Sequence, residues 1–309
     1  MSAIDHDPAG GMEGNASMGL TLTEYLANGN LLIADGATGT MLMAAGLPAG
    51  TPPEIWNVEH PDRISALHQS YLQAGSRIIL TNTFGGSRIK LSKAGLGERM
   101  AELNLAAGRL ARQAAGELAY VAGDIGPTGD LMAPMGSLTF EDALETFSEQ
   151  AVALADGGVD AIWVESMSDI DEARAAVLAA KQSTNLPVFC SLSFGRKART
   201  MMGVSPGQAA RELWPLGLAA IGANCGEGLE MIPDVLDQMK EAAPGARLIA
   251  KPNAGLPRLE AGEAVYDLSP GEFAQQMAEF VTLGALIVGS CCGSSPEYIA
   301  ALAHQVHPG

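Results

Sequence analysis

Basic residues are scarce in this chain of 309 residues. It has 18 lysines and arginines against 35 aspartates and glutamates, and no lysine or arginine occurs before Arg63. The resulting net charge of −17 argues against nucleic acids and anionic membrane surfaces as partners, because both require basic patches. The start of the chain also lacks the basic character of a signal or transit segment, so we expect a cytoplasmic protein.

Other features that the sequence lacks narrow the class of protein further. No apolar run is long enough to cross a bilayer. Four cysteines, two of them adjacent, do not look like the pattern of a disulfide framework. Only 17% of the residues are charged while 47% are hydrophobic, which is ample for one large core or two modest ones.

Residues 1–20 are rich in glycine, alanine, aspartate and methionine without periodicity, and we predict a flexible tail there. Beyond them, residues 21–309 alternate between short apolar runs and longer amphipathic stretches, which predicts a single α/β domain. The apolar runs, expected to be buried strands, are residues 31–34, 78–80, 120–122, 161–164, 188–192, 219–223, 248–250 and 286–288.

The stretches between these runs have apolar residues at three- and four-residue spacing, as amphipathic helices require. The expected helices are residues 63–74, 100–116, 140–155, 170–181, 206–216, 228–241, 270–283 and 296–306. Eight strand–helix units in a row, with strands apolar on both faces, predict a (β/α)8 TIM barrel. A doubly wound open sheet is the alternative, but eight uninterrupted units fit a barrel better.

The predicted strands all end in polar residues, and the C-terminal ends of barrel strands carry the chemistry in this fold. These ends are Asp35, Thr81 to Thr83, Asp124, Glu165, Ser193, Asn224 with Cys225, Lys251, and Cys291 with Cys292. All of them are therefore expected around one mouth of the barrel.

Three of the four cysteines lie at predicted strand ends. Cys291 and Cys292 are neighbours, a spacing poorly suited to a mutual disulfide, and Cys225 follows another strand. Three thiolates that converge in this way can bind one soft cation, and we predict Zn²⁺ with an open fourth position. The alternative is three buried core cysteines, since free cysteine is often buried. Cys190, inside a strand, is interpreted as a core residue.

The polar motifs at the strand ends resemble those of the homocysteine S-methyltransferase family. The matching segments are residues 35–40, 81–86, 123–129, 163–165, 222–226 and 289–293. The family includes betaine–homocysteine methyltransferase and the homocysteine domain of cobalamin-dependent methionine synthase. The similarity runs from about residue 31 to about residue 303. It implies a zinc-bearing barrel that transfers a methyl group to the sulfur of homocysteine, giving methionine.

The resemblance also implies roles for residues at the mouth. Zinc held by the three cysteines would deprotonate and position the thiol of homocysteine. Glu165 is expected to bind the ammonium group of homocysteine, with help from Asp35, and the backbone amides from Gly36 to Thr38 to accept its carboxylate. The structural alternatives are a turn-forming Asp35 and a salt-bridged Glu165. Asn224 is expected to support the metal loop through hydrogen bonds.

The methyl donor is less well defined by the sequence. Betaine is the first expectation, because residues 53–58 and 199–204 look like those of bacterial enzymes described as betaine–homocysteine methyltransferases. Its trimethylammonium group needs aromatic faces, and Trp56 and Phe84, together with Trp163, are the candidates. The animal enzymes have aromatic residues where this chain has Gly85 and Ser166. A methylcorrinoid on a partner protein, or a sulfonium compound, is the alternative donor.

Two different classes of function remain. Lys251, at the end of the seventh predicted strand, has the position of a Schiff-base lysine in a barrel lyase or aldolase. A non-catalytic barrel with structural zinc is also conceivable, but such sites usually have four protein ligands rather than three. The lysine hypothesis leaves the three cysteines unexplained.

Overall fold

The computed structural model describes residues 19–195, 197–260 and 263–307. Eight parallel strands form one sheet in the order β1-β10-β7-β6-β5-β4-β3-β2. The sheet closes between its two end strands, because Ala34 pairs with Ile78 and the Arg77 amide donates to the Ile33 carbonyl at 2.7 Å. The strands are β1 (Leu32–Ile33), β2 (Ile78–Leu80), β3 (Tyr120–Ile125), β4 (Ala161–Met167), β5 (Val188–Leu192), β6 (Ala220–Cys225), β7 (Leu248–Pro252) and β10 (Ala285–Val288). The predicted (β/α)8 barrel is confirmed.

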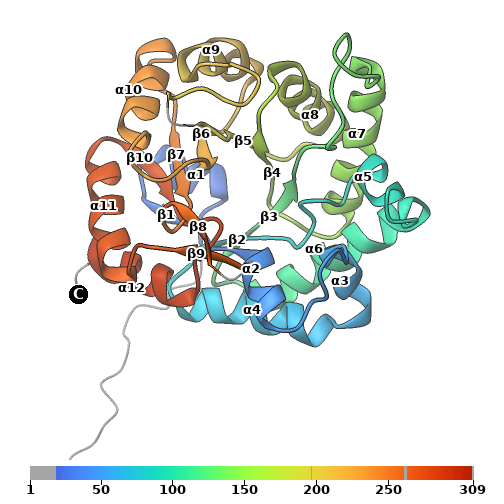
Figure 1. The fold of residues 1–309 in the computed structure, drawn as a ribbon, viewed down its shortest axis with the longest axis horizontal. Coiled ribbons are helices and arrows are strands. Elements are labelled where there is room, and N and C mark those ends of the chain that lie inside the picture. The colour runs from blue at the N-terminus through green and yellow to red at the C-terminus, as the bar shows by residue number, and fades with distance from the viewer. Residues whose placement is uncertain (1–18, 196, 261–262, 308–309) are drawn as a thin grey trace, which may run out of the picture.

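Helices surround the barrel (Figure 1). Those that follow the strands are α4 (Pro61–Gln73), α6 (Met100–Ala115), α7 (Phe140–Asp156), α8 (Ile170–Ser183), α9 (Pro206–Leu213), α10 (Ile232–Ala242), α11 (Pro270–Thr282) and α12 (Pro296–Val306). Each corresponds to a predicted helix, with ends shifted by up to a few residues. In the described part of the chain, no helix is long and apolar enough to span a membrane.

Two clusters of apolar side chains stabilise the barrel, one inside it and one between its strands and the surrounding helices. Inward-facing side chains from all eight strands form one cluster: Leu32, Ala34, Ile78, Leu80, Tyr120, Ala122, Ala161, Trp163, Phe189, Ala220, Ile249 and Ile287. The larger cluster fills the space between the strands and the helices. Because side chains alternate along a strand, the residue two positions beyond an inward-facing one also faces inward. This alternation places Asp124, Glu165, Ser191 and Lys251 one layer above the apolar filling.

The opposite end of the barrel is covered by a short helix that was not predicted. Helix α1 (Leu22–Ala27) begins with a capping box between Thr21 and Glu24, and its Leu22 and Leu26 join the interior cluster. The predicted flexible tail covers residues 1–20, of which residues 1–18 lie outside the described residues. Leu20 is described, and its carbonyl accepts a hydrogen bond from the Tyr120 hydroxyl at 2.7 Å.

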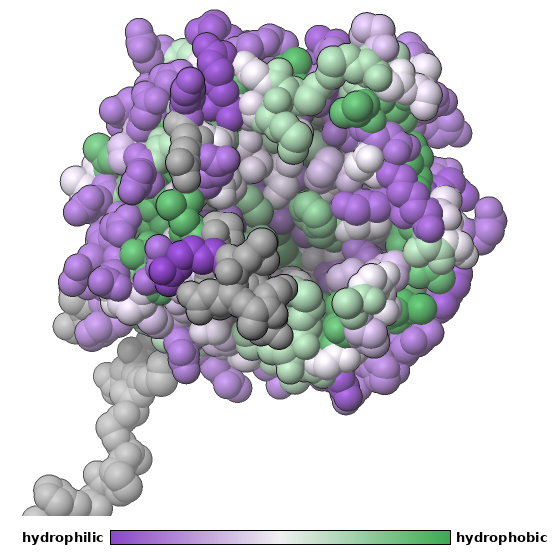
Figure 2. Space-filling view, viewed as in Figure 1, coloured by the Kyte–Doolittle hydropathy of each residue, from purple (hydrophilic) through white to green (hydrophobic). Residues whose placement is uncertain are grey.

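Several elements around the mouth were also not predicted. The loop after β1 contains α2 (Thr38–Ala44), η1 (Pro53–Ile55) and α3 (Trp56–Glu59), and the loop after β2 contains α5 (Arg88–Ser92) and η2 (Gly97–Arg99). Away from the mouth, η3 (Trp214–Leu216) forms the last turn of the helix predicted over residues 206–216, because α9 stops at Leu213. The antiparallel hairpin of β8 (Pro257–Glu260) and β9 (Glu263–Tyr266) is inserted after β7, and in Figure 1 it lies on the viewer's side of the barrel. Figure 2 shows the same face, hollowed near its centre and mostly hydrophilic around its edge.

Candidate active site

Three sulfur atoms meet at the mouth of the barrel. Cys225 ends β6, while Cys291 and Cys292 follow β10. Their Sγ atoms all lie within 4.8 Å of one another, and those of Cys225 and Cys291 are 2.6 Å apart. Among the described residues, no other group of three metal-binding side chains lies this close together. Hydrogen bonds from the other two thiols lower the pKa of Cys292, which favours its thiolate form. This donor set fits one soft cation with a fourth position left for a ligand.

The backbone around Cys225 turns sharply. Cys225 has a φ of 54° and Gly226 a φ of 81°, both in the left-handed region. A side chain at Gly226 would collide with the carbonyl oxygen of Phe194, so only glycine fits there. The turn is held by Asn253, whose Nδ2 donates to the Gly226 carbonyl at 2.9 Å. Left-handed non-glycine residues cost energy and persist where the surroundings enforce them, often at functional sites.

A chain of hydrogen bonds supports the same turn from inside the barrel. Asn224 is fully buried, and its Oδ1 accepts from the Ser166 amide at 2.8 Å and from the Ser191 hydroxyl at 2.7 Å. Its Nδ2 donates to Ser166 Oγ at 2.6 Å, and that hydroxyl lies 3.7 Å from Cys225 Sγ. Trp163 extends the chain, because its Nε1 donates to Ser191 Oγ at 3.0 Å. Asn224 therefore joins β4, β5 and β6 directly below the sulfur atoms.

Three carboxyl groups and one lysine share the buried layer beside the sulfur atoms. Asp35, Asp124, Glu165 and Lys251 expose 1%, 5%, 6% and 3% of their surfaces. Lys251 Nζ lies 3.6 Å from Asp35 Oδ1 and 3.8 Å from Glu165 Oε2. Those two oxygens, together with Asp124 Oδ1, are buried and have no hydrogen-bond partner among the described residues. Buried polar atoms are normally satisfied, so three orphaned oxygens in one layer indicate a place for a ligand that donates hydrogen bonds.

The charges of this layer are strongly coupled. Burial raises the pKa of Glu165 to about 7, although Lys251 opposes this shift. Burial, reinforced by the charge of Glu165, also raises the pKa of Asp124. Burial alone would lower the pKa of Lys251, but Glu165 and Asp35 outweigh it and the pKa is raised. Lys251 is therefore a charged ammonium at neutral pH and a poor nucleophile for a Schiff base.

The loop after β1 is tied to the cysteine loop. Ser294 Oγ accepts from the Ala37 amide at 3.0 Å and donates to the Cys291 carbonyl at 2.8 Å. Gly36 is buried against Tyr71 and Ser294, which leave no room for a side chain. Of the amides expected to bind a carboxylate, that of Ala37 therefore already has a partner. Thr38 is the first residue of α2 and is half-buried.

The aromatic rings expected to bind a donor are mostly enclosed. Trp163 is fully buried in the barrel interior. Trp56, in α3, is 4% exposed, and its ring lies 4.8 Å from the Arg63 guanidinium and packs edge-on against His60. Phe84 is 37% exposed, but Lys90 Nζ lies over its ring, 4.7 Å from the centroid. The three rings do not form an open cage.

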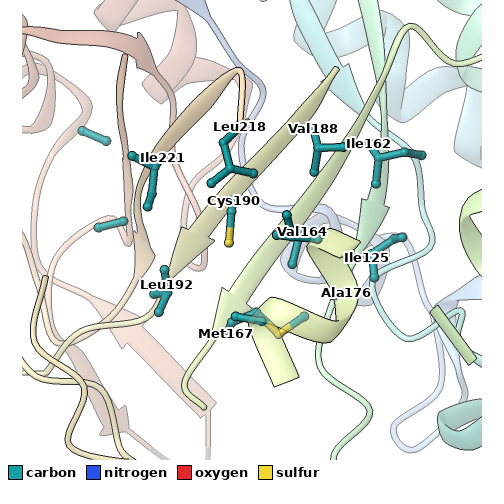
Figure 3. Packing of buried hydrophobic residues seen from close by; sticks show 14 of the residues in the cluster. Ile125, Ile162, Val164, Met167, Ala176, Val188, Cys190, Leu192, Leu218 and Ile221 are labelled. Carbon is teal, nitrogen blue, oxygen red and sulfur yellow. The ribbon is translucent and has the colours of Figure 1, made fainter. Parts of the chain in front are cut away.

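Cys190 lies away from the other cysteines. It is fully buried in β5, and Figure 3 shows its side chain among the apolar residues of neighbouring strands. Burial raises its pKa to about 12, so it stays a neutral thiol. This environment agrees with its interpretation as a core residue.

Some residues of the site had no assigned role in the sequence. Asp124 was expected at the mouth without a function, and Ser191 was not singled out, although both lie two residues beyond a buried inward-facing residue. That two-residue period was the signal that could have identified them. Tyr266 was also missed. It comes from the hairpin, and its ring lies so close to Gly293 that no side chain would fit there.

The chain is similar to known methyltransferases and methionine synthases. The family model for homocysteine S-methyltransferase matches residues 32–306. The chain therefore belongs to the homocysteine S-methyltransferase family, a class of methyltransferases. Methionine synthase of Mycobacterium tuberculosis is 32% identical over 294 residues, covering 89% of this chain and 24% of that protein. Methionine synthase of Mycobacterium leprae is 32% identical over 303 residues, covering 92% and 25%. The chain thus spans about a quarter of the length of these relatives.

The fold is shared with a solved member of the family. The metallated form of the homocysteine methyltransferase MmuM from Escherichia coli superposes with a TM-score of 0.76 at 23% identity, covering 91% of this chain and 98% of that one. Its oxidized form gives a TM-score of 0.74, covering 88% and 94%. At this level of identity the likeness establishes the fold.

Proposed function

We propose that this chain transfers a methyl group to the sulfur of homocysteine, giving methionine, with Zn²⁺ bound by Cys225, Cys291 and Cys292. The observation that carries the proposal is the placement of three soft ligands beside a layer of orphaned carboxylate oxygens. Homocysteine has a thiol at one end and an ammonium group at the other, so it matches both halves of the site. When bound, Zn²⁺ would supply a Lewis acid that lowers the pKa of the homocysteine thiol and makes it nucleophilic.

The chain's own residues would position the acceptor. Glu165 Oε2 and Asp35 Oδ1 are buried and have no hydrogen-bond partner among the described residues, so they are the candidate acceptors for the ammonium group. Asn224 and Ser166 would hold Cys225 in place. The amides from Gly36 to Thr38 were expected to accept the carboxylate, but the Ala37 amide already donates to Ser294 and Gly36 is enclosed. Fixing the acceptor at both ends aligns its sulfur with the incoming methyl group and reduces the entropic cost of the transfer.

Because the aromatic rings are enclosed, betaine is no longer the first candidate for the methyl donor. Betaine would need open aromatic faces, and a cation over Phe84 would meet the ammonium of Lys90. A methylcorrinoid carried by a partner protein needs no such cage, and the methionine synthase relatives are about four times as long as this chain. Large apolar side chains are also exposed on loops after three strands: Phe84, Leu131, Met135 and Met201. We therefore place the methylcorrinoid before betaine and a sulfonium compound.

The metal half of the proposal is tested by elemental analysis. Cys225→Ala and Cys292→Ala should lose most of the bound zinc, while Cys190→Ala, the matched control in the core, should retain it. If both site variants keep full zinc, the assignment of the ligands is wrong.

The reaction is tested by supplying homocysteine and one methyl donor at a time to the zinc-loaded protein and measuring methionine. Methylcobalamin should support turnover, whereas betaine and S-methylmethionine should give less. Turnover with betaine alone would restore the donor expected from the sequence. Borohydride trapping of a carbonyl substrate on Lys251, without any methionine formation, would instead support the lyase alternative.

A further inference from the structure

Lys251 is a buried cation in the acceptor pocket that the proposed reaction leaves without a role. Among the described residues it is the only lysine or arginine that is buried. It lies on β7 in register with Asn224 of β6, and the next residue, Pro252, pairs with Cys225. The Cys291 amide donates to the Pro252 carbonyl at 2.8 Å. Lys251 therefore belongs to the carboxylate layer and lies on the strand next to the one that ends at Cys225.

The position of the Lys251 ammonium group is unfavourable if the ligand brings only another ammonium group into the pocket. The two oxygens nearest to Nζ, Asp35 Oδ1 at 3.6 Å and Glu165 Oε2 at 3.8 Å, are the ones expected to bind the ammonium of homocysteine. Two cations between the same pair of oxygens would repel each other strongly in a buried site. Both distances also exceed those of a direct hydrogen bond, so Lys251 leaves the oxygens unsatisfied.

An α-amino acid avoids this repulsion when each of its two charged groups lies next to a pocket group of opposite charge. The ammonium group of the ligand then contacts Glu165 and its carboxylate contacts Lys251, while Asp35 remains a counter-charge of Lys251. The alternative carboxylate site is less open, because the Ala37 amide is used by Ser294 and Gly36 is enclosed.

We propose that Lys251 determines acceptor specificity by binding the α-carboxylate of the acceptor amino acid. This inference rests on the proposed function, since it assumes that homocysteine enters with its thiol at the cysteines. Lys251 then selects zwitterionic amino-acid thiols over simple aminothiols, and Glu165 selects them over thiol acids.

Calorimetric titration of the metal-loaded protein with three thiols tests the proposal. Homocysteine has both charged groups, 3-aminopropane-1-thiol lacks the carboxylate, and 4-sulfanylbutanoate lacks the ammonium. Wild-type protein should bind homocysteine about 10- to 100-fold more tightly than 3-aminopropane-1-thiol, the range expected for one buried charged hydrogen bond. Lys251→Met should weaken homocysteine and 4-sulfanylbutanoate by a similar factor and leave 3-aminopropane-1-thiol unchanged or tighter.

Controls separate this inference from the function on which it rests. Lys240→Met removes an exposed lysine on α10 and should leave all three affinities unchanged. Lys251→Gln, which retains a polar side chain, should show the same selective loss if Lys251→Met does not fold. A wild-type preference below about threefold, or an equal loss for all three thiols in the variants, would overturn the role of Lys251. Failure of the wild-type protein to bind homocysteine would instead overturn the proposed function.

Discussion

Replacing Asn224 with alanine offers a direct test of how the barrel supports the cysteine cluster. The Asn224 side chain makes three hydrogen bonds, two to Ser166 and one to Ser191, and none of the three is to a sulfur atom. The substitution would leave the Ser166 amide and the Ser191 hydroxyl without their acceptor. Ser166 also has a left-handed φ of 59°, a conformation that depends on such support.

The expected effects have two separate magnitudes. Each of these two buried groups costs about 1–3 kcal/mol when it is left unsatisfied, so the free energy of unfolding should fall by about 2–6 kcal/mol. Loss of a hydrogen-bonded support behind a metal ligand typically weakens metal binding by about 10- to 100-fold. That range corresponds to about 1.4–2.8 kcal/mol of binding free energy.

Chelator competition measures the metal affinity, and denaturant unfolding measures the stability. Asn104→Ala is the matched control, because Asn104 is also fully buried and its side chain also makes three hydrogen bonds, to Gly86, Met100 and Gln150. It should lose a comparable amount of stability and keep its metal affinity. If Asn224→Ala binds metal as tightly as the control, the hydrogen-bond chain does not support the cluster.

Three further predictions concern other parts of the molecule. Gly226→Ala should weaken metal binding by at least about tenfold, because the added side chain would strike the Phe194 carbonyl. Gly245→Ala is the control, since Gly245 is also left-handed but has open space around it, and it should keep its metal affinity. Equal metal affinities of the two variants in a competition assay would contradict this prediction. Burial lowers the pKa of His68 from 6.5 to about 4, so the unfolded chain binds its proton first and stability declines as pH falls from 6.5 to 4. His68→Leu should reduce the loss of unfolding free energy between pH 8 and pH 5 by about 2 kcal/mol, and an unchanged pH profile would count against the buried neutral histidine. Glu165→Gln should raise the dissociation constant for homocysteine by at least about tenfold in calorimetry while bound metal is unchanged, and an unaltered constant would return Glu165 to a structural role.

The strands and outer helices could be predicted because their patterns are local. Buried parallel strands are continuously apolar, and helix α8 shows its period within its own sequence. Helix α1 was missed because six residues are too few to show a period, although the capping box of Thr21 and Glu24 was visible in the sequence. The hairpin was missed because its partner on the barrel, the Gly293 loop, is distant in sequence.

The site could be predicted only in part for a related reason. Cys225, Cys291 and Cys292 lie at strand ends, and the C-terminal ends of all barrel strands meet at one mouth. The closeness of the three sulfur atoms could therefore be predicted once the barrel was recognised. The environment of a side chain in a long loop does not follow in this way. Trp56 was assigned to the mouth because of its place after the first strand, but the loop folds into α3 and buries the ring. The proximity of Lys251 to Asp35 likewise depends on distances across the barrel that no sequence spacing records.

The carboxylate layer connects the stability of the barrel with its specificity. Asp35, Asp124 and Glu165 place three acidic groups around one buried lysine, and burial raises the pKa of each of them. Buried charges without full partners destabilise a folded protein, so this layer costs folding energy. A ligand ammonium would remove part of that cost, and a ligand carboxylate beside Lys251 would keep the charges alternating. Selection of the acceptor would then depend on the sign and order of charges in the pocket more than on its shape.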